Sequence, residues 1–120
     1  MTPFSPSARY YLYREPADIR KSFDGLCGLV EQGLGRDPTS GEVFVFLNRR
    51  RTHVKLLAFD RSGFVLYYKR LEEGTFEVPN VAGEALSWRD LMLMLEGVSL
   101  SSARYRKRFT LPISRVNTAA

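Results

Sequence analysis

The side chains of this sequence that could perform chemistry are few and scattered. Phosphodiester chemistry uses clustered carboxylates that hold divalent metal ions, whereas the acids here stand singly, apart from Glu72 and Glu73 in a predicted turn. The single histidine, His53, has no cysteine or second histidine near it in the sequence, and Cys27 is the only cysteine. No nucleophile elbow, phosphate-binding loop or dinucleotide-binding fingerprint occurs. We therefore expect a protein that is not an enzyme and that holds neither a metal nor a cofactor.

The positive charge is the chemically useful feature, and it is unevenly placed. The chain has 18 basic and 13 acidic residues, which gives a net charge of +5. No acid follows Glu96 but five basic residues do, so the preceding part holds 13 of each sign. A cationic segment joined to a neutral domain suits a polyanion such as nucleic acid, although it can also serve only to keep the chain soluble. The candidate phosphate contacts in this segment are Arg104, Arg106, Lys107 and Arg108.

Three consecutive apolar segments predict the sheet that would carry the other basic residues. The segments 43–49, 53–60 and 64–71 are rich in β-branched and aromatic residues, as strands are. They are joined by residues 50–52 and 61–63, and connections this short force neighbouring strands to be antiparallel. A three-stranded meander over residues 43–71 follows.

Two helices and an N-terminal strand complete the predicted fold. Apolar residues recur at helical spacing from Ile19 onward, so residues 19–33 are expected to be a helix with Asp18 as its N-cap. A capping box at Ser87 predicts a second helix near 88–96. The fold class is therefore α+β: an antiparallel sheet of four to five strands packed with two helices, in which the meander is joined by an N-terminal strand, 9–14, and by a short edge strand, 75–78.

The first predicted helix carries two glycines on its polar side, Gly25 and Gly28. Glycine costs up to about 1 kcal/mol relative to alanine inside a helix. It would let another backbone approach closely, so this face is a candidate contact for a partner protein; the alternative is a tolerated imperfection. The candidate contact residues are Lys21, Gly25, Gly28 and Gln32.

Counting from three-residue loops sets the pairing of the strands. Arg49 then faces His53, Leu47 faces Lys55, and Lys55 faces Lys69. Like charges opposite each other are destabilising, so an anionic partner would explain the two lysines; alternatively, their stems cover apolar neighbours while the ammonium groups stay in water. The candidate nucleic-acid contacts on the sheet are Arg49, Arg50, Arg51, Lys55, Lys69 and Arg70, with Tyr67 as a stacking surface.

The same register predicts one apolar face and one basic face, because side chains alternate along a strand. The apolar face, which should lie under the helices, holds Phe44, Phe46, Val54, Leu56, Ala58, Phe64, Leu66 and Tyr68. The residues expected to be largely buried are Phe23, Val30, Phe44, Phe46, Leu56, Leu66 and Leu95.

The chain is expected to form one domain. Residues 1–97 would make the α+β domain, and residues 98–120 a basic C-terminal tail. No apolar run reaches the roughly 18 residues that a membrane helix needs, and the first residues lack the pattern of a secretory signal. We therefore expect a cytoplasmic protein without membrane contact, whose oligomeric state stays open.

Several blocks of the sequence, taken in order, resemble one family. They are DIRKSFDGL at 18–26, DPTSG at 37–41, VFVFLNRRR at 43–51, KLL at 55–57, DRSGF at 60–64, YKRLEEGTF at 68–76 and LEG at 95–97. Over about residues 9 to 97 the chain is similar to the TnpB-type accessory protein, the second open reading frame, of the insertion sequence 66 family. Glycine is usual in that family where Ser22 stands here. The resemblance implies a role in the transposition of a bacterial mobile element, beside a separate DDE-type transposase encoded by the same element.

Three functions are consistent with these features. The first is a DNA-associated accessory factor that helps assemble the transposase on the ends of the element. The second is a protein-only adaptor that binds the transposase through the face around Gly25 and Gly28 and never touches DNA. The third is an RNA-binding regulator of the element, although the sequence lacks an aromatic RNA-recognition motif. The partners expected are the co-encoded transposase, with or without a further accessory protein, and DNA.

Overall fold

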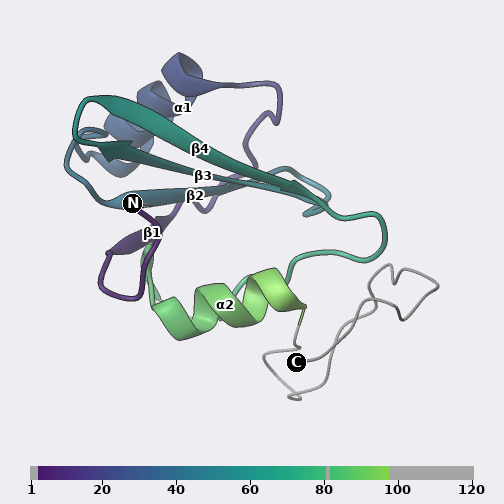
Figure 1. Ribbon diagram of the computed structural model, residues 1–120. Helices are drawn as coiled ribbons and strands as arrows, with labels where there is room; N and C mark the ends of the chain where they lie inside the picture. Colours follow the sequence, from purple (N-terminus) through teal and green to yellow (C-terminus); the bar gives the residue numbers. More distant parts are fainter. Residues whose placement is uncertain (1–2, 81, 98–120) are drawn as a thin grey trace, which may run out of the picture.

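The computed structural model describes residues 3–80 and 82–97, which build one sheet with helices on both sides (Figure 1). The strands are β1 (Tyr10–Leu12), β2 (Val43–Leu47), β3 (His53–Asp60), β4 (Gly63–Arg70) and β5 (Ala85–Leu86). The helices are α1 (Phe23–Leu29), which continues as the π-helical η1 (Val30–Leu34), and α2 (Trp88–Glu96). None of these helices is long and apolar enough to cross a membrane. The predicted basic tail, 98–120, lies outside the described residues.

The strands form one sheet in the order β4-β3-β2-β1-β5, and the fold class α+β is confirmed. The meander of β2, β3 and β4 is antiparallel, as predicted. The N-terminal strand, by contrast, runs parallel to β2 and antiparallel to β5, so the sheet is mixed. The reason is that α1 lies in the connection from β1 to β2, and a helical crossover returns the chain to the end of the sheet where β1 began.

The predicted edge strand at 75–78 is wrong. Phe76 in this segment is buried, and its N–H donates to the carbonyl of Arg51 over 2.7 Å. The segment therefore closes one end of the sheet instead of extending its edge. The edge beside β1 is formed by β5, which the sequence analysis did not predict.

The two helices cover opposite faces of the sheet, with α1 above it and α2 below it in Figure 1. On the α1 face, Leu26 and Val30 belong to the same buried cluster as Phe44 and Phe46. On the α2 face, Leu91 and its neighbours pack with the side chains of β2 that point the other way. The expectation that both helices lie over one face was wrong. Because β2 is buried on both sides, it reads as an uninterrupted apolar run rather than an alternating one.

The register of both hairpins differs from the prediction by one residue. Leu47 pairs with Val54, and Lys55 pairs with Tyr68 rather than with Lys69. The physical reason is turn length. The β2–β3 turn spans four residues, 49–52, and the β3–β4 turn spans only Arg61 and Ser62.

A slip of one residue moves every side chain of a strand to the other face. The side chains of Val54, Leu56 and Ala58 therefore face α2, and those of Lys55 and Leu57 face α1. Lys55 and Lys69 lie on opposite faces of the sheet. The predicted repulsion between these two lysines does not exist.

The first helix begins at Phe23, four residues later than predicted. Asp18 is not its N-cap; its carboxylate instead accepts a hydrogen bond from the backbone N–H of Arg20 and binds the Arg20 guanidinium. Those hydrogen bonds hold the pKa of Asp18 well below its ordinary value. Since Phe23 is the first helical residue and not part of the inward stripe, it is 40% exposed, and its predicted burial is wrong.

The second helix matches its prediction. The hydroxyl of Ser87 accepts a hydrogen bond from the Asp90 N–H at 3.0 Å, as a capping box requires. Gly97 ends the helix with φ of 87°, a left-handed conformation that suits glycine. Of the predicted core, Val30, Phe44, Phe46 and Leu56 are buried, and Leu66 and Leu95 are half-buried.

Candidate nucleic-acid interface

Three of the predicted basic residues come together in the turn between β2 and β3. Arg49, Arg50 and Arg51 are consecutive and exposed in this turn. We call residues 48–52 the arginine turn. The other predicted residues on the sheet do not share one surface. Lys55 lies on the α1 face, Lys69 contacts α2, and Arg70 is the last residue of β4.

The backbone of the arginine turn is held by the side chain of Asn48. Its Oδ1 atom accepts hydrogen bonds from the N–H groups of Thr52, at 2.9 Å, and His53, at 3.0 Å. Arg51 has φ of 58°, and its N–H donates to the carbonyl of Asn48. The Arg51 carbonyl accepts the N–H of the buried Phe76. The turn is therefore tied to the core, and the arginine backbone is fixed.

The three guanidinium groups of the arginine turn have no carboxylate within ion-pair distance among residues 3–80 and 82–97. Arg20, Arg36 and Arg70, by contrast, form ion pairs, for example Arg70 with Glu72 at 2.8 Å. A pocket of about 160 Å³ lies beside the turn, between Arg49 and Arg51 on one side and residues 14–16 on the other. Three adjacent, unpaired and exposed cations create a positive potential that favours an anion.

Lys55 does not belong to this surface, which corrects its predicted position. Only 6% of Lys55 is exposed. Its ammonium donates to the carbonyl of Ile19 over 2.6 Å and to that of Lys21 over 2.7 Å, and it lies 4.7 Å from the centre of the Tyr68 ring. Burial lowers the pKa of Lys55. The side chain fastens the turn before α1 to the sheet and is not accessible to a phosphate.

Lys69 links the end of β4 to the end of α2. Its ammonium donates to the carbonyl of Leu95 over 3.3 Å, and a cation at a helix C-terminus is favourable. Because Lys69 pairs with Val54, just after the arginine turn, α2 ends at the same end of the sheet as that turn. Gly97, which ends α2, therefore lies at the arginine-turn end of the sheet.

The predicted partner face on α1 is partly open. A Cβ atom on Gly28 would meet nothing within 4 Å, whereas one on Gly25 would lie 3.1 Å from the Lys21 side chain. Lys21 and Gln32 are exposed. The glycine with a close contact is Gly33, where a Cβ would lie 2.5 Å from the Tyr13 ring. The role of Gly33 could not be predicted from the sequence, because no local pattern indicates that a distant ring packs on it.

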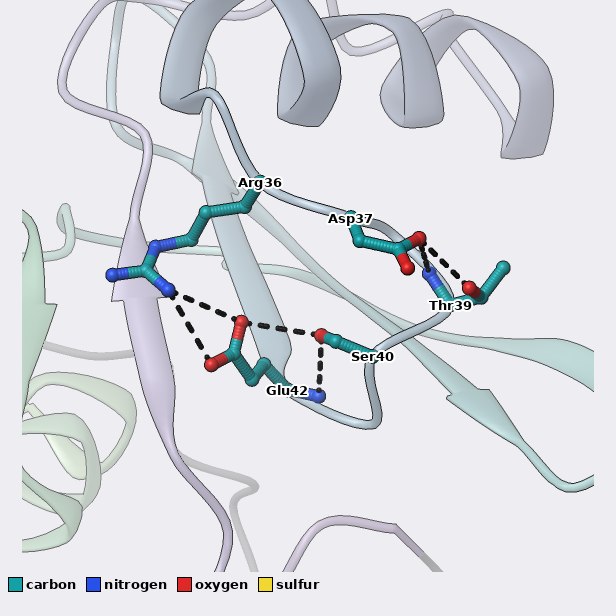
Figure 2. A network of polar contacts seen from close by, with 5 residues as sticks. All are labelled: Arg36, Asp37, Thr39, Ser40 and Glu42. Atoms are coloured by element: carbon teal, nitrogen blue, oxygen red, sulfur yellow. Dashed lines mark hydrogen bonds and ion pairs between the residues drawn. The ribbon is translucent and has the colours of Figure 1, made fainter.

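The loop before β2 is held by a network of polar contacts (Figure 2). Arg36 lies 3.4 Å from both carboxylate oxygens of Glu42, and its guanidinium covers the Tyr11 ring at 3.7 Å. Asp37 accepts hydrogen bonds from the N–H and the hydroxyl of Thr39. These contacts confirm that the DPTSG block is a turn, and they account for its polar residues structurally.

The described residues hold no group of three or more side chains suited to bind a metal ion. His53 instead lies in the arginine-turn network, with its Nδ1 atom 2.8 Å from the Thr52 hydroxyl. Cys27 is half-buried against the α1 cluster, and burial raises the pKa of its thiol, which makes it a poor nucleophile.

Comparison with known proteins gives one family and two similar sequences. The model of the family described as IS66 Orf2 like protein matches residues 8–105. Uncharacterized protein y4jC of Sinorhizobium fredii is 34% identical over 96 residues, which are 78% of this chain and 82% of that protein. Uncharacterized protein y4hO of the same organism is 31% identical over 100 residues, covering 82% and 87% of the two chains. No solved structure gives a significant match.

Proposed function

Because this chain belongs to the IS66 Orf2 like family, whose members serve an insertion sequence, we propose that it is a non-catalytic accessory factor of transposition that contacts DNA and helps the element's own transposase act on it. The family supports the accessory role in transposition. The contact with DNA is our inference from the basic surfaces of the chain.

The arginine turn is the observation that carries the DNA contact. Its three arginines are exposed, fixed at the backbone and without an anionic partner in the described part of the chain. Duplex DNA presents a phosphate about every 3.4 Å along each strand, and arginine is well suited to phosphate through its planar fork of donors. Such contacts position a protein on DNA without reading its sequence.

The basic segment after Gly97 adds to this surface in our proposal. Arg104, Arg106, Lys107 and Arg108 follow α2 in the sequence, and α2 ends at the arginine-turn end of the sheet. Both groups of cations would then reach one DNA molecule. Their contribution is electrostatic, so it should weaken as the salt concentration rises.

The adaptor function is the second candidate, supported by the open space at Gly28. Nothing in the described structure requires glycine there, yet glycine costs up to about 1 kcal/mol relative to alanine in a helix. In this proposal the transposase packs against α1 near Gly28, Lys21 and Gln32. An RNA-binding regulator remains the third candidate, and it shares the electrostatic argument.

A gel-shift experiment separates these functions. Full-length protein should retard both element-end and random duplexes at 50 mM salt, with and without the transposase. A chain that ends at residue 103 should bind every duplex more weakly. A full-length control with glutamine at 104, 106, 107, 108 and 115, which removes the same five positive charges, should behave like the truncation, because charge and not length is what the proposal requires. If neither full-length nor truncated protein shifts DNA at low salt, yet both capture the transposase, the DNA contact is refuted and the adaptor function stands.

A further inference from the structure

Tyr68 is an exposed ring held against two other groups beside the arginine turn. It is 52% exposed, although the sequence analysis placed it on the buried apolar face. Its ring centre lies 4.7 Å from the Lys55 ammonium and 5.9 Å from the centre of the His53 ring, with 31° between the two ring planes. Since Lys55 is buried, it occupies the inner face of the Tyr68 ring, and the exposed half of the residue is directed away from the sheet.

The Tyr68 ring is held in place by the two groups that it contacts, the Lys55 ammonium and the His53 ring. The Lys55 ammonium is held by two carbonyl groups and the His53 ring by the Thr52 hydroxyl, so neither neighbour is free to turn away. A ring fixed in this way loses little conformational freedom when another flat group stacks on its outer face. The two rings together form a small aromatic surface.

This aromatic surface is adjacent to the arginine turn. His53 directly follows the turn, and the N–H of Leu71 donates to the carbonyl of Thr52 over 2.8 Å. Tyr68 precedes Leu71 by three residues, so it lies about 10 Å from the turn along the strand direction. That distance corresponds to about three nucleotides of a stacked strand at roughly 3.4 Å each. One strand can therefore place a base on Tyr68 and phosphates at the arginines.

The charges around the ring do not oppose a polyanion. Two acids are already paired: Asp18, whose charge acts on Lys55, binds Arg20 at 2.8 Å, and Glu72 binds Arg70 at 2.8 Å. The Lys55 cation beneath the ring contacts two carbonyl groups and the ring itself, and the charge of Asp18 also stabilises it.

We infer that the DNA bound by this protein includes unpaired bases, one of which stacks on Tyr68 beside His53 while the arginine turn holds the neighbouring phosphates. This inference rests on the proposed function and narrows its ligand to single-stranded or locally opened DNA. A paired base has both of its faces covered within the duplex, so only an unpaired base can offer a face to the ring. Positively charged grooves with exposed aromatic rings bind single strands in this way.

The test compares variants of the full-length chain by fluorescence anisotropy. The probes are a fluorescein-labelled oligothymidylate of 12 nucleotides, a 12-base-pair duplex and an oligouridylate of the same length. Tyr68→Leu should weaken oligothymidylate binding by about 5- to 100-fold and leave duplex binding within twofold. Tyr68→Phe, which keeps the ring, should bind like the unmodified protein. The matched control is Tyr67→Leu, since Tyr67 is 38% exposed on the other face of the same strand, and it should have no effect.

Cross-linking of the unmodified protein supplies a readout that does not depend on how the variants fold. An oligothymidylate that carries 5-iodouracil should cross-link to Tyr68 or His53 on irradiation, and not to Tyr67. Full oligothymidylate affinity in Tyr68→Leu, or a cross-link elsewhere, overturns the stacking inference and leaves the proposed duplex contact intact. Tighter binding of oligouridylate than of oligothymidylate overturns the assignment to DNA. If none of the three probes binds, both the proposed contact with DNA and the stacking inference are contradicted.

Discussion

Replacing Phe46 with alanine is expected to lower the free energy of unfolding by about 3–5 kcal/mol. Phe46 lies in the central strand β2, has no exposed surface, and packs against the Tyr13 ring at 5.7 Å. The loss combines the transfer free energy of the ring with a cavity between α1 and the sheet. It is a large share of the 5–15 kcal/mol that usually stabilises a domain. Urea denaturation followed by tryptophan fluorescence measures it.

Phe23→Ala is the matched control for this prediction. The same side chain is removed, but Phe23 is 40% exposed at the start of α1, so the loss should be half as large or less. Equal losses for the two variants would contradict the described positions of these rings.

Replacing Lys55 with methionine is expected to lower the free energy of unfolding by about 2–4 kcal/mol. Methionine keeps most of the stem but leaves the carbonyls of Ile19 and Lys21 without their donor. Hydrogen bonds from a charged group contribute roughly 1.5–3 kcal/mol each, and partial access of water to the freed carbonyls limits the loss. The turn before α1 should also open, so trypsin should cleave after Arg20 and Lys21 faster than in the unmodified protein.

Lys69→Met is the control at the same end of the sheet. Its ammonium makes a single longer hydrogen bond, to Leu95 at 3.3 Å, so the loss should stay near 1 kcal/mol or below. If Lys55→Met were as stable as the unmodified protein and equally resistant to trypsin, the structural role of Lys55 would be wrong.

The parts of the fold that depend on local signals could be predicted from the sequence. The helix 88–96 follows from the Ser87 capping box and from Gly97, and both act within one helical turn. The strands of the meander follow from their β-branched and aromatic residues, and their antiparallel order from the shortness of the turns. The family resemblance was carried by the same segments and is confirmed over residues 8–105.

The register could not be predicted, because it depends on which residues adopt left-handed conformations. Glycine is the usual choice for such positions, and Gly63 was the expected one in the β3–β4 turn. The structure instead uses Arg51 and Arg61, with φ of 58° and 62°, and Gly63 has no positive φ. The Asn48 side chain stabilises the β2–β3 turn, which is one residue longer than predicted. No sequence pattern indicates the hydrogen bonds that it accepts.

Within the candidate site, the sequence predicts exposure correctly for residues in a turn but not for residues within a strand. The arginines of the β2–β3 turn are exposed whichever register the strands adopt. Their predicted exposure is therefore correct although the predicted register is wrong. The slip between β2 and β3 moved Lys55 to the face of Phe44 and Phe46, where it is buried. Tyr68 lies on that same face, as predicted, but it is exposed there. A lysine or a tyrosine on a strand can be buried or exposed, and the residue type alone does not decide between the two.

The most direct test of the DNA contact is the salt dependence of duplex binding by an arginine-turn variant. In this variant Arg49 and Arg50 become glutamine, and Arg51 becomes glycine, which tolerates φ of 58°. The matched control removes three exposed charges elsewhere, through Arg9→Gln, Arg61→Gly and Arg89→Gln, with Arg61 in the same left-handed conformation.

The affinity for a random duplex is measured from 50 to 200 mM salt for both variants and the unmodified protein. The slope of log Kobs against log salt should become shallower by about 2–3 units in the arginine-turn variant, because three phosphate contacts at about 0.9 each are lost. The control should change the slope by less than one unit. Equal slopes for the two variants would contradict the assignment of the DNA contact to the arginine turn.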